Sequence, residues 1–344
     1  MKAHIRGAGL VGGFGSGMAA LEAAIRRQPE PPPAASDLSS RAPAVPALAA
    51  QTCLLDRLIP PRTLRRVDHY ARMALLASHL ALEDADMGSG LPETAGLVVA
   101  TGMGPTANTL DLQPADATEA DLALSPILFS NSVHNAAAAD ISMMLKIRGP
   151  CLSINQYEMS VPLAFQTAID WLEEGRTETV LVGSVDCFSK ALHEAAQSGR
   201  DSASADSIQG VDPVGEGSAF FILARSETPG ARCPYVQHVH MGTTSRSDAP
   251  PVLNTLVLHN RRNADFLGRS HLHACFAHLY GAFPTSMGMD VAAALALLRT
   301  EQLLSMCLPQ SEGGPMLPEN PRIGCLKRGE TGDWGMIVVG RDGR

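Results

Sequence analysis

The side chains able to act as nucleophiles or general bases are scattered along this sequence of 344 residues, which contains seven cysteines and eleven histidines. The cysteines form no CxxC pair and have no regular spacing, so they predict neither a zinc site nor a disulfide framework. A single histidine is more often a structural residue than a catalyst. We therefore interpret the cysteines as reduced thiols of a cytoplasmic protein, and we expect no metal ion.

The composition excludes several classes of protein. Hydrophobic residues make up 45% of the chain and charged residues 18%, and no apolar stretch of about 18 residues lacks a charge or a glycine-rich break. These values argue against a disordered chain and against a membrane span. The formal net charge of −8 provides no basic field for nucleic acid. The N-terminus lacks a clean cleavage site, so we expect no signal peptide.

The segment from Gly7 to Gly12 matches the GxGxxG pattern of dinucleotide-binding folds. Such a site needs a helix directly after the third glycine and an acidic residue about twenty positions further on to hold the ribose. Here more glycines follow, and the candidate acids Glu30 and Asp37 lie in or beside a Pro- and Ala-rich stretch, residues 28–50, which we expect to be a surface loop. We predict a strand-to-helix turn at these glycines and no nucleotide.

The apolar pattern alternates between helical spacing and continuous short runs. Helices are expected at 64–82, 135–146 and 159–174, and strands at 97–100, 179–185, 218–224, 253–258 and 336–339. Residues 197–212 are rich in Ser, Ala and Asp and are predicted to form a mobile loop. The pattern predicts an α/β fold whose sheet is covered on both faces.

Six short motifs are informative through their order along the chain. They are the glycine-rich opening, Arg65–Asp68 leading to Ala81–Ala85, Gly149-Pro150, Gly183–Val185, Gly215–Gly217, and His278 with Gly281-Ala282. In this order they resemble the β-ketoacyl synthase family of the thiolase fold. The resemblance implies a thiolase-like αβαβα layered fold of two similar halves, residues 1–155 and 156–344, each with a mixed sheet covered by helices.

The Gly149-Pro150 motif indicates where the family's nucleophile would stand. In an active synthase a cysteine lies nine residues after this glycine, at a strand-to-helix elbow where the helix N-terminus lowers the pKa of the thiol. The same count in this chain reaches Glu158. Cys151 stands at the start of the preceding strand, and we interpret it as a packed small hydrophobe. The resemblance therefore implies that no catalytic nucleophile is present.

Two histidines complete the site in active members of the family. His278 fits the second of them, and His259 fits the first, although residues 260–263 replace the glycine-rich turn expected there. The lysine expected five residues before His278 is His273, and residues 329–335 stand in place of the family's closing glycine-rich loop. We interpret His278 as a relic held by packing, and a chemical role remains the alternative.

Relatives that lack the cysteine are either decarboxylases, with a glutamine at this position, or chain length factors, which form heterodimers with an active synthase. A carboxylate at Glu158 would repel both the enolate of decarboxylation and the malonyl carboxylate. We therefore expect a catalytically silent subunit rather than an enzyme by itself. The alternative is a malonyl-carrier decarboxylase or acyl hydrolase using His278, His259 and Glu158.

The segment from Ser125 to Ala136 resembles the chain length factor-like subunits of bacterial systems that make aryl polyenes and related polyenes. By this resemblance, two segments are expected at the partner interface and its acyl tunnel. They contribute Gly102, Met103, Pro105, Thr106, Ala107 and Asn108 from a turn, and Phe129, Asn131, His134 and Asn135 from the second segment. For His134 we favour a structural hydrogen bond over a contact with the partner.

The resemblance also implies the partners of this chain: an active ketosynthase subunit and an acyl carrier protein. The phosphopantetheine arm of the carrier would hold the growing chain through the partner subunit, so no cofactor of this chain's own is expected.

Overall fold

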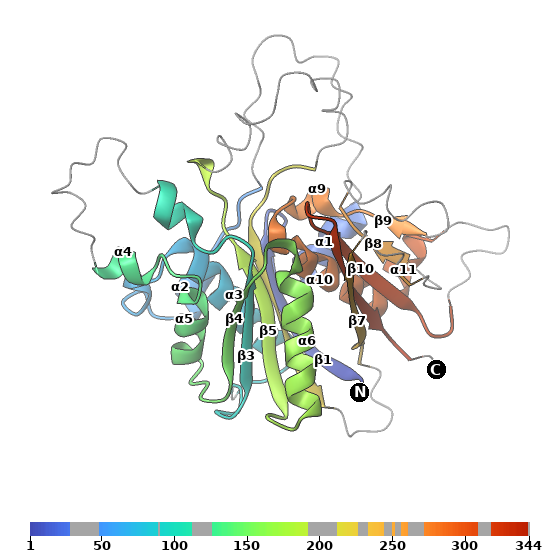
Figure 1. The fold of residues 1–344 in the computed structure, drawn as a ribbon, viewed down its shortest axis with the longest axis horizontal. Coiled ribbons are helices and arrows are strands. Elements are labelled where there is room, and N and C mark those ends of the chain that lie inside the picture. Colours follow the sequence, from blue (N-terminus) through green and yellow to red (C-terminus); the bar gives the residue numbers. More distant parts are fainter. Residues whose placement is uncertain are drawn as a thin grey trace, which may run out of the picture.

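The computed structural model describes residues 1–27, 48–88, 90–111, 126–191, 212–225, 233–243, 250–251, 256–260, 272–308 and 318–342. The predicted loops at 28–50 and 197–212 lie almost entirely outside the described residues. Within this part of the chain, strands and helices alternate as an α/β fold (Figure 1).

The strands of the described residues form one hydrogen-bonded path in the order β4-β3-β5-β6-β1-β7-β11-β10-β8-β9, with β2 (Gly15–Ser16) paired to β1. The first half of the path contains β1 (Ala3–Gly12), β3 (Gly96–Thr101), β4 (Cys151–Asn155), β5 (Thr179–Asp186) and β6 (Gly217–Arg225). The second half contains β7 (Tyr235–Thr243), β8 (Leu256–Leu258), β9 (His273–Ala274), β10 (Arg322–Arg328) and β11 (Asp333–Gly340).

The two sets of strands have the same order. Numbered along the chain within each set, the strands run 3-2-4-5-1 from β4 to β1 and again from β9 to β7. The two first strands join the sets, because Ala3 and His4 of β1 pair with Val236 and Tyr235 of β7. The repeat therefore divides the chain between Arg225 and Tyr235. The division predicted near residue 155 falls inside the first set, since β5 and β6 pair with β3 and β1.

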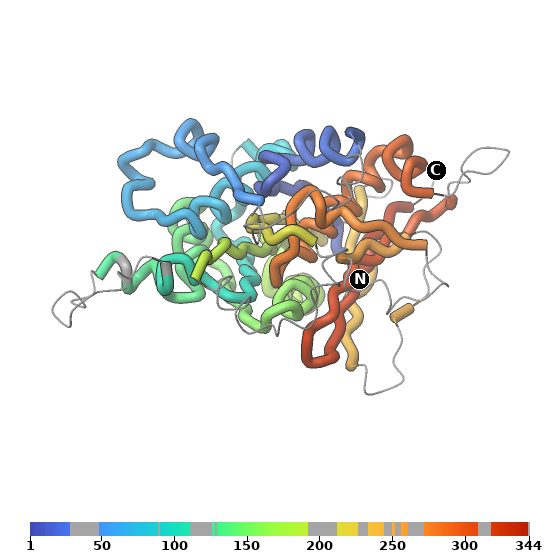
Figure 2. Tube along the Cα trace, turned by 90° about the horizontal axis from the view of Figure 1, so that it is seen from above, coloured from blue at the N-terminus to red at the C-terminus, as the bar shows by residue number. Residues whose placement is uncertain are grey.

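Helices cover both faces of the first set. Helices α3 (His69–Asp84) and α5 (Ala136–Met144) pack on one face, and α6 (Ser160–Glu173) packs on the other. In Figure 1 α6 lies in front of these strands, and the view from above in Figure 2 shows the light-blue segment of α3 on the opposite side. Helix α10 (Met287–Arg299) holds the place in the second set that α6 holds in the first, after the third strand and before the fourth.

The apolar core follows these layers. One cluster of buried side chains includes residues of both α6 and α10, and a second lies between α3, α5 and the other face of the first set. A small third cluster on the outer face of β10 and β11 includes Leu326, Trp334 and Met336. Because strands β3, β5 and β6 are buried on both faces, their near-continuous apolar sequence is explained.

The remaining helical segments are short, apart from α1. They are α1 (Met18–Arg27), α2 (Leu55–Leu58), α4 (Pro126–Ser130), α9 (Ala277–Tyr280) and α11 (Glu301–Met306), with single turns η1 (Leu64–Arg66), η2 (Ala107–Asp111), η3 (Tyr157–Met159) and η7 (Pro284–Ser286).

The predicted elements within the described residues are confirmed with shifted ends. Of the strand expected at 253–258, residues 253–255 lie outside the described residues and 256–258 form β8. The expected helix at 64–82 begins at His69, because the side chain of Asp68 caps it by accepting a hydrogen bond from Ala71 N at 2.7 Å. The expected strands at 97–100, 179–185, 218–224 and 336–339 correspond to β3, β5, β6 and β11.

The predicted turn at Gly7–Gly12 is wrong, because β1 continues through Gly12 before the hairpin to β2. A Cβ atom on Gly9 would lie 2.1 Å from the carbonyl oxygen of Ala77, and one on Gly7 would lie 2.4 Å from that of Ala81. Both carbonyls belong to α3. The glycines therefore allow α3 to pack directly on the strand backbone.

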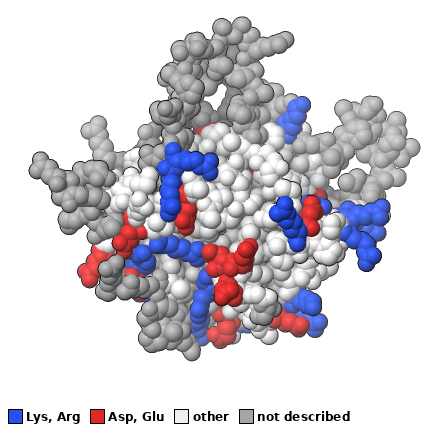
Figure 3. All heavy atoms as spheres, turned by 180° about the vertical axis from the view of Figure 1, so that it is seen from behind, with Lys and Arg blue, Asp and Glu red and all other residues white. Residues whose placement is uncertain are grey.

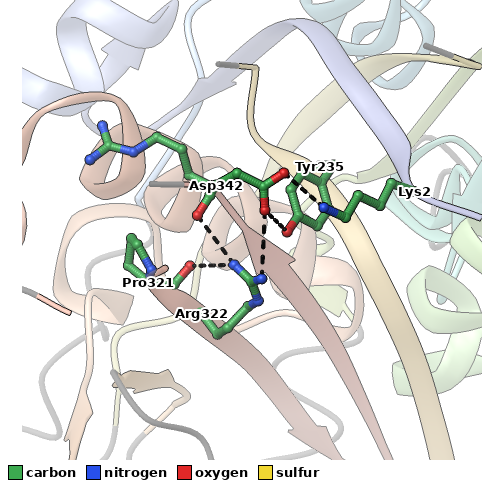
Figure 4. Close-up of polar contacts among 6 residues, drawn as sticks. Lys2, Tyr235, Pro321, Arg322 and Asp342 are labelled. Carbon is green, nitrogen blue, oxygen red and sulfur yellow. Dashed lines mark hydrogen bonds and ion pairs between the residues drawn. The ribbon is translucent and has the colours of Figure 1, made fainter. Parts of the chain in front are cut away.

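A polar cluster joins the two ends of the chain (Figure 4). Asp342 accepts hydrogen bonds from Lys2 Nζ and from the Tyr235 hydroxyl, both at 2.7 Å, and Arg322 lies 3.8 Å away. The ammonium of Lys2 also stands 4.4 Å from the centroid of the Tyr235 ring. Since Lys2 precedes β1 and Asp342 follows β11, this cluster fastens the seam between the two sets of strands.

Charges of both signs are mixed on the rear face of the molecule. Figure 3 shows acidic and basic side chains of the described residues side by side on the rear of the molecule, without an extended field of one sign. Within the described residues, no helix combines the length and apolar character needed to cross a membrane.

Candidate functional site

An elbow joins β4 to α6 and carries Glu158. Tyr157 in this elbow has φ of +46°, a region that costs a non-glycine residue of the order of 1–3 kcal/mol and is common at functional sites. The hydroxyl of Ser160 accepts a hydrogen bond from Gln156 N at 2.7 Å and lies 2.9 Å from the carbonyl oxygen of Thr101. The elbow is thus held to the end of β3, and the half-buried Glu158 side chain stands at the N-terminus of α6.

A buried lysine lies beside this elbow. The single turn η3 packs against η7 and β10, and these two elements contribute Ser286 and Lys327. Lys327 is only 4% exposed, and its ammonium donates to the carbonyl oxygen of Phe283 at 2.9 Å and to Ser286 Oγ at 2.7 Å. Burial lowers the pKa of Lys327, and the nearby carboxylates of Asp290 and Glu158 oppose this effect. Glu158 therefore lies near enough to Lys327 to favour its charged form.

Asp290 adds a second buried charge-bearing group to this region. Burial raises the pKa of Asp290 to about 7, and the hydroxyl of Tyr280 donates a hydrogen bond to it. Neither Lys327 nor Asp290 was among the residues predicted from the sequence. The local signal for Lys327 is a lysine that follows the apolar run of residues 323–326 in β10, two residues before the 329–335 segment.

The structure pairs two of the three histidines that stand at positions of the family's catalytic site. His259 follows β8, is buried, and its Nε2 lies 3.0 Å from Nδ1 of His273 on the neighbouring strand β9. Burial lowers the pKa of His259. His278 lies in α9, where its ring centroid is 6.4 Å from that of Phe276. The residue found where the family has a lysine is therefore a direct partner of His259.

The two segments predicted for the interface lie together. Asn108 Nδ2 donates to the carbonyl oxygen of Asn131 at 3.0 Å, and a Cβ atom on Gly104 would lie 2.7 Å from the ring of His134. The Tyr70 hydroxyl donates to the carbonyl oxygen of His134 at 3.4 Å. Among the described residues, the His134 ring contacts Gly104 rather than capping α5.

Residues 38–228, more than half of the chain, match the family model of the N-terminal domain of β-ketoacyl synthases. This chain belongs to the β-ketoacyl synthase family. A curated relative, the putative polyketide β-ketoacyl synthase 1 of Streptomyces virginiae, is 26% identical over 223 residues, which are 59% of this chain and 53% of that protein. The chain thus spans about half the length of this relative.

Solved structures of synthases share the fold. The ishigamide ketosynthase/chain length factor has a TM-score of 0.70 and 18% identity over the whole of both chains. A type II polyketide acyl-carrier protein in complex with its ketosynthase, bound to the hexaketide, gives a TM-score of 0.71 with 12% identity over 99% of each chain. A β-ketoacyl synthase of Burkholderia phymatum gives 0.64 with 13% identity over all of both chains. The predicted thiolase-like α/β fold is confirmed.

Within the described part of this synthase family member, several thiols are held in the protonated form. Burial raises the pKa of Cys187 to about 12 and that of Cys307 to about 11, and it also raises the pKa of Cys325. Cys151 begins β4 and is exposed rather than packed, which corrects the prediction, since β4 lies at the end of the sheet. No cluster of three or more potential metal ligands occurs among the described residues.

Proposed function

We propose that this chain is a chain length factor: a ketosynthase-like subunit without a nucleophile of its own. It forms a heterodimer with an active β-ketoacyl synthase and shapes the tunnel in which a polyketide or polyene grows on an acyl carrier protein. The active subunit provides the cysteine and receives the phosphopantetheine arm of the carrier.

The observation that carries this proposal is the open sheet edge at β4. Within the described residues, β4 pairs only with β3, and Leu152, its second residue, is 41% exposed. An uncovered strand edge with apolar side chains is a site for pairing with another chain. We infer that the active synthase places its own edge strand here.

Exposed apolar residues gather around this edge. Of the eleven large hydrophobic residues that are exposed in the described chain, seven lie between residues 110 and 157. These seven, called here the edge patch, are Leu110, Ile127, Phe129, Val133, Met143, Leu152 and Tyr157. They belong to η2, α4, α5, β4 and the segments beside them, and the helices α4 and α5 stand at the same side of the molecule as β4 in Figure 1. Such a concentration is typical of a protein interface.

Glu158 supports a silent role within the pair. The positive end of the α6 dipole favours an ionised carboxylate at this position, and a carboxylate is neither a thiolate nucleophile nor a stabiliser of an enolate. A homodimer of this chain would contain two such sites. A partner with an intact cysteine is therefore needed for chain elongation.

Mixing the purified chain with an active β-ketoacyl synthase of the same organism tests the proposal. We expect a 1:1 complex in size-exclusion chromatography with native mass spectrometry, and chain elongation on acyl carrier protein only when both subunits are present. A stable homodimer that ignores the synthase would contradict the proposal.

The rival function is decarboxylation or hydrolysis by this subunit alone. The hydrogen bond between His259 and His273 argues against it, because it occupies the Nε2 atom that would otherwise face a substrate. Incubation of the chain alone with malonyl carrier protein, followed by mass spectrometry, should return the malonyl form unchanged. If the unmodified chain alone forms acetyl carrier protein and the Glu158→Ala variant does not, the rival function is established.

A further inference from the structure

The carboxylate of Asp186 connects three segments that are distant in the sequence. Asp186 ends β5 and is 1% exposed. Its Oδ1 accepts hydrogen bonds from Thr101 Oγ1 at 2.9 Å, Gly102 N at 3.0 Å and Met103 N at 3.1 Å. Its Oδ2 accepts from Thr285 N at 3.1 Å and Thr285 Oγ1 at 2.8 Å. Oδ2 also lies 3.2 Å from Gly102 N. The two oxygens together thus hold the turn after β3 and η7 of the second set of strands.

Side-chain oxygens accept the hydrogen bonds of the Gly102, Met103 and Gly104 amides in the turn after β3. Within it, Gly104 N donates to the Thr101 hydroxyl at 2.8 Å, and that hydroxyl in turn donates to Asp186. Gly104 has φ of +68°, so the chain reverses sharply there and leads into η2. Asp186 and Thr101 therefore determine where the turn lies.

The anchor of the turn is itself rigid. Thr285 and Ser286 belong to η7, and Ser286 accepts a hydrogen bond from the buried Lys327 at 2.7 Å. On the opposite side, the Ser160 hydroxyl lies 2.9 Å from the carbonyl oxygen of Thr101 and ties the turn to the elbow of Glu158. A continuous set of hydrogen bonds thus runs from β10 through η7 and Asp186 to the turn.

The turn borders the edge patch. The segment from Gly104 passes directly into η2, which contributes the exposed Leu110, and Gly104 packs against His134 beside Val133. The turn is therefore the part of the buried hydrogen-bond network that lies nearest to the proposed partner.

We propose that Asp186 is a positioning residue that fixes the Gly102–Gly104 turn as a rigid wall of the shared acyl tunnel, so that the length of the product depends on a carboxylate that touches no substrate. The assignment of the wall rests on the proposed chain length factor function. The fixing of the turn by Asp186 does not depend on it.

Amide hydrogen exchange of the full-length chain tests the fixing directly. Asp186→Asn leaves only one side-chain oxygen as an acceptor and points an NH2 group at the amide donors. Because charge-assisted hydrogen bonds are lost, hydrogen exchange at the Gly102 and Met103 amides should become at least about tenfold faster. Thr101→Val removes the acceptor of Gly104 N and should accelerate exchange at that amide.

Thr285→Val is the matched control. Thr285, like Thr101, is a fully buried threonine whose hydroxyl donates to Asp186, but its loss leaves every hydrogen bond of the turn intact. Exchange in the turn should then remain as in the unmodified chain. If Asp186→Asn fails to fold, the comparison of the two threonine variants still decides. Equal exchange in the turn for both variants would overturn the inference.

Product length tests the wall. In the complex with the active synthase, mass spectrometry of the carrier-bound chains should show a shifted length distribution for Thr101→Val and an unchanged one for Thr285→Val. If Thr101→Val accelerates exchange in the turn but leaves the product-length distribution unchanged, the turn is not a wall of the tunnel. If the unmodified chain binds no synthase, the proposed function fails, while the exchange measurement still decides whether Asp186 fixes the turn.

Discussion

His69 Nε2 lies 2.8 Å from Oε1 of Glu216, within the Gly215–Gly217 motif. The same carboxylate accepts hydrogen bonds from Ala50 N and Phe188 N, both at 3.0 Å. The hydrogen bond to Glu216 raises the pKa of His69, and although burial alone would raise the pKa of Glu216, its hydrogen bonds with His69 and with Phe188 lower it. This pair joins the start of α3 to the residue directly before β6.

The His69–Glu216 pair predicts a pH dependence of stability. Because the pKa of His69 is raised in the folded protein, its contribution is complete below the unfolded value of about 6.5 and is lost as the pH rises through the folded value. His69→Gln should therefore lower the free energy of unfolding at pH 6 by up to about 1 kcal/mol, since the pair is partly exposed, and by less at pH 9. Urea unfolding at both pH values measures this. A larger cost at pH 9 would contradict it.

Asp290 predicts a pH dependence from a fully buried group. Its pKa of about 7 exceeds the unfolded value of about 3.9, so the folded protein keeps a proton that the unfolded chain has released. Stability should fall as the pH rises between these values. Asp290→Asn cannot ionise, so its stability relative to the unmodified protein should improve by about 2 kcal/mol between pH 5 and pH 8. Urea unfolding across this range checks the trend, and a constant difference would refute it.

The close contact between Gly9 and α3 predicts that any larger residue at this position destabilises the fold. A Cβ atom there would lie 2.1 Å from the carbonyl oxygen of Ala77, and backbone atoms cannot rotate away as a side chain can. Gly9→Ala should destabilise the protein by about 1–3 kcal/mol or more. The control is Gly88→Ala, where nothing lies within 4 Å of the new atom, and this variant should remain near the unmodified melting temperature. Thermal unfolding compares the two variants, and equal melting temperatures would show that α3 does not press on this strand.

Leu152 predicts the location of the partner. Leu152→Arg places a charge on the exposed edge strand β4 and should weaken the heterodimer at least about 30-fold, as expected for a central interface residue. Met241→Arg is the control, because Met241 is equally exposed at 43% but lies on β7, away from the edge patch. Affinity for the synthase is measured by biolayer interferometry, and circular dichroism verifies that both variants fold. Similar losses in both variants would place the interface elsewhere.

Local features of the sequence were sufficient to predict the elements whose apolar residues have a regular spacing. Helix α3 combines apolar spacing with Asp68 at its N-terminus, and β5 is a continuous apolar run, so both were predicted with errors of only a few residues. The glycines of β1 led to a wrong prediction because they are required by the close packing of α3, which lies about 70 residues away. The sequence of β4 resembles a buried strand, and only the strand order reveals it as an edge.

The sequence by itself determined the order of the family motifs and the glutamate at the nucleophile position, because these depend on residue identity and on short spacings. The tertiary structure alone decided that Lys327 stands beside the Glu158 elbow, that His259 pairs with His273, and that Asp186 holds a turn 84 residues before it and Thr285 99 residues after it. Burial forces each of these polar groups to find a partner, but the partner can come from any part of the chain. Such pairings leave no periodic pattern in the sequence, and only the packed strands and helices bring them together.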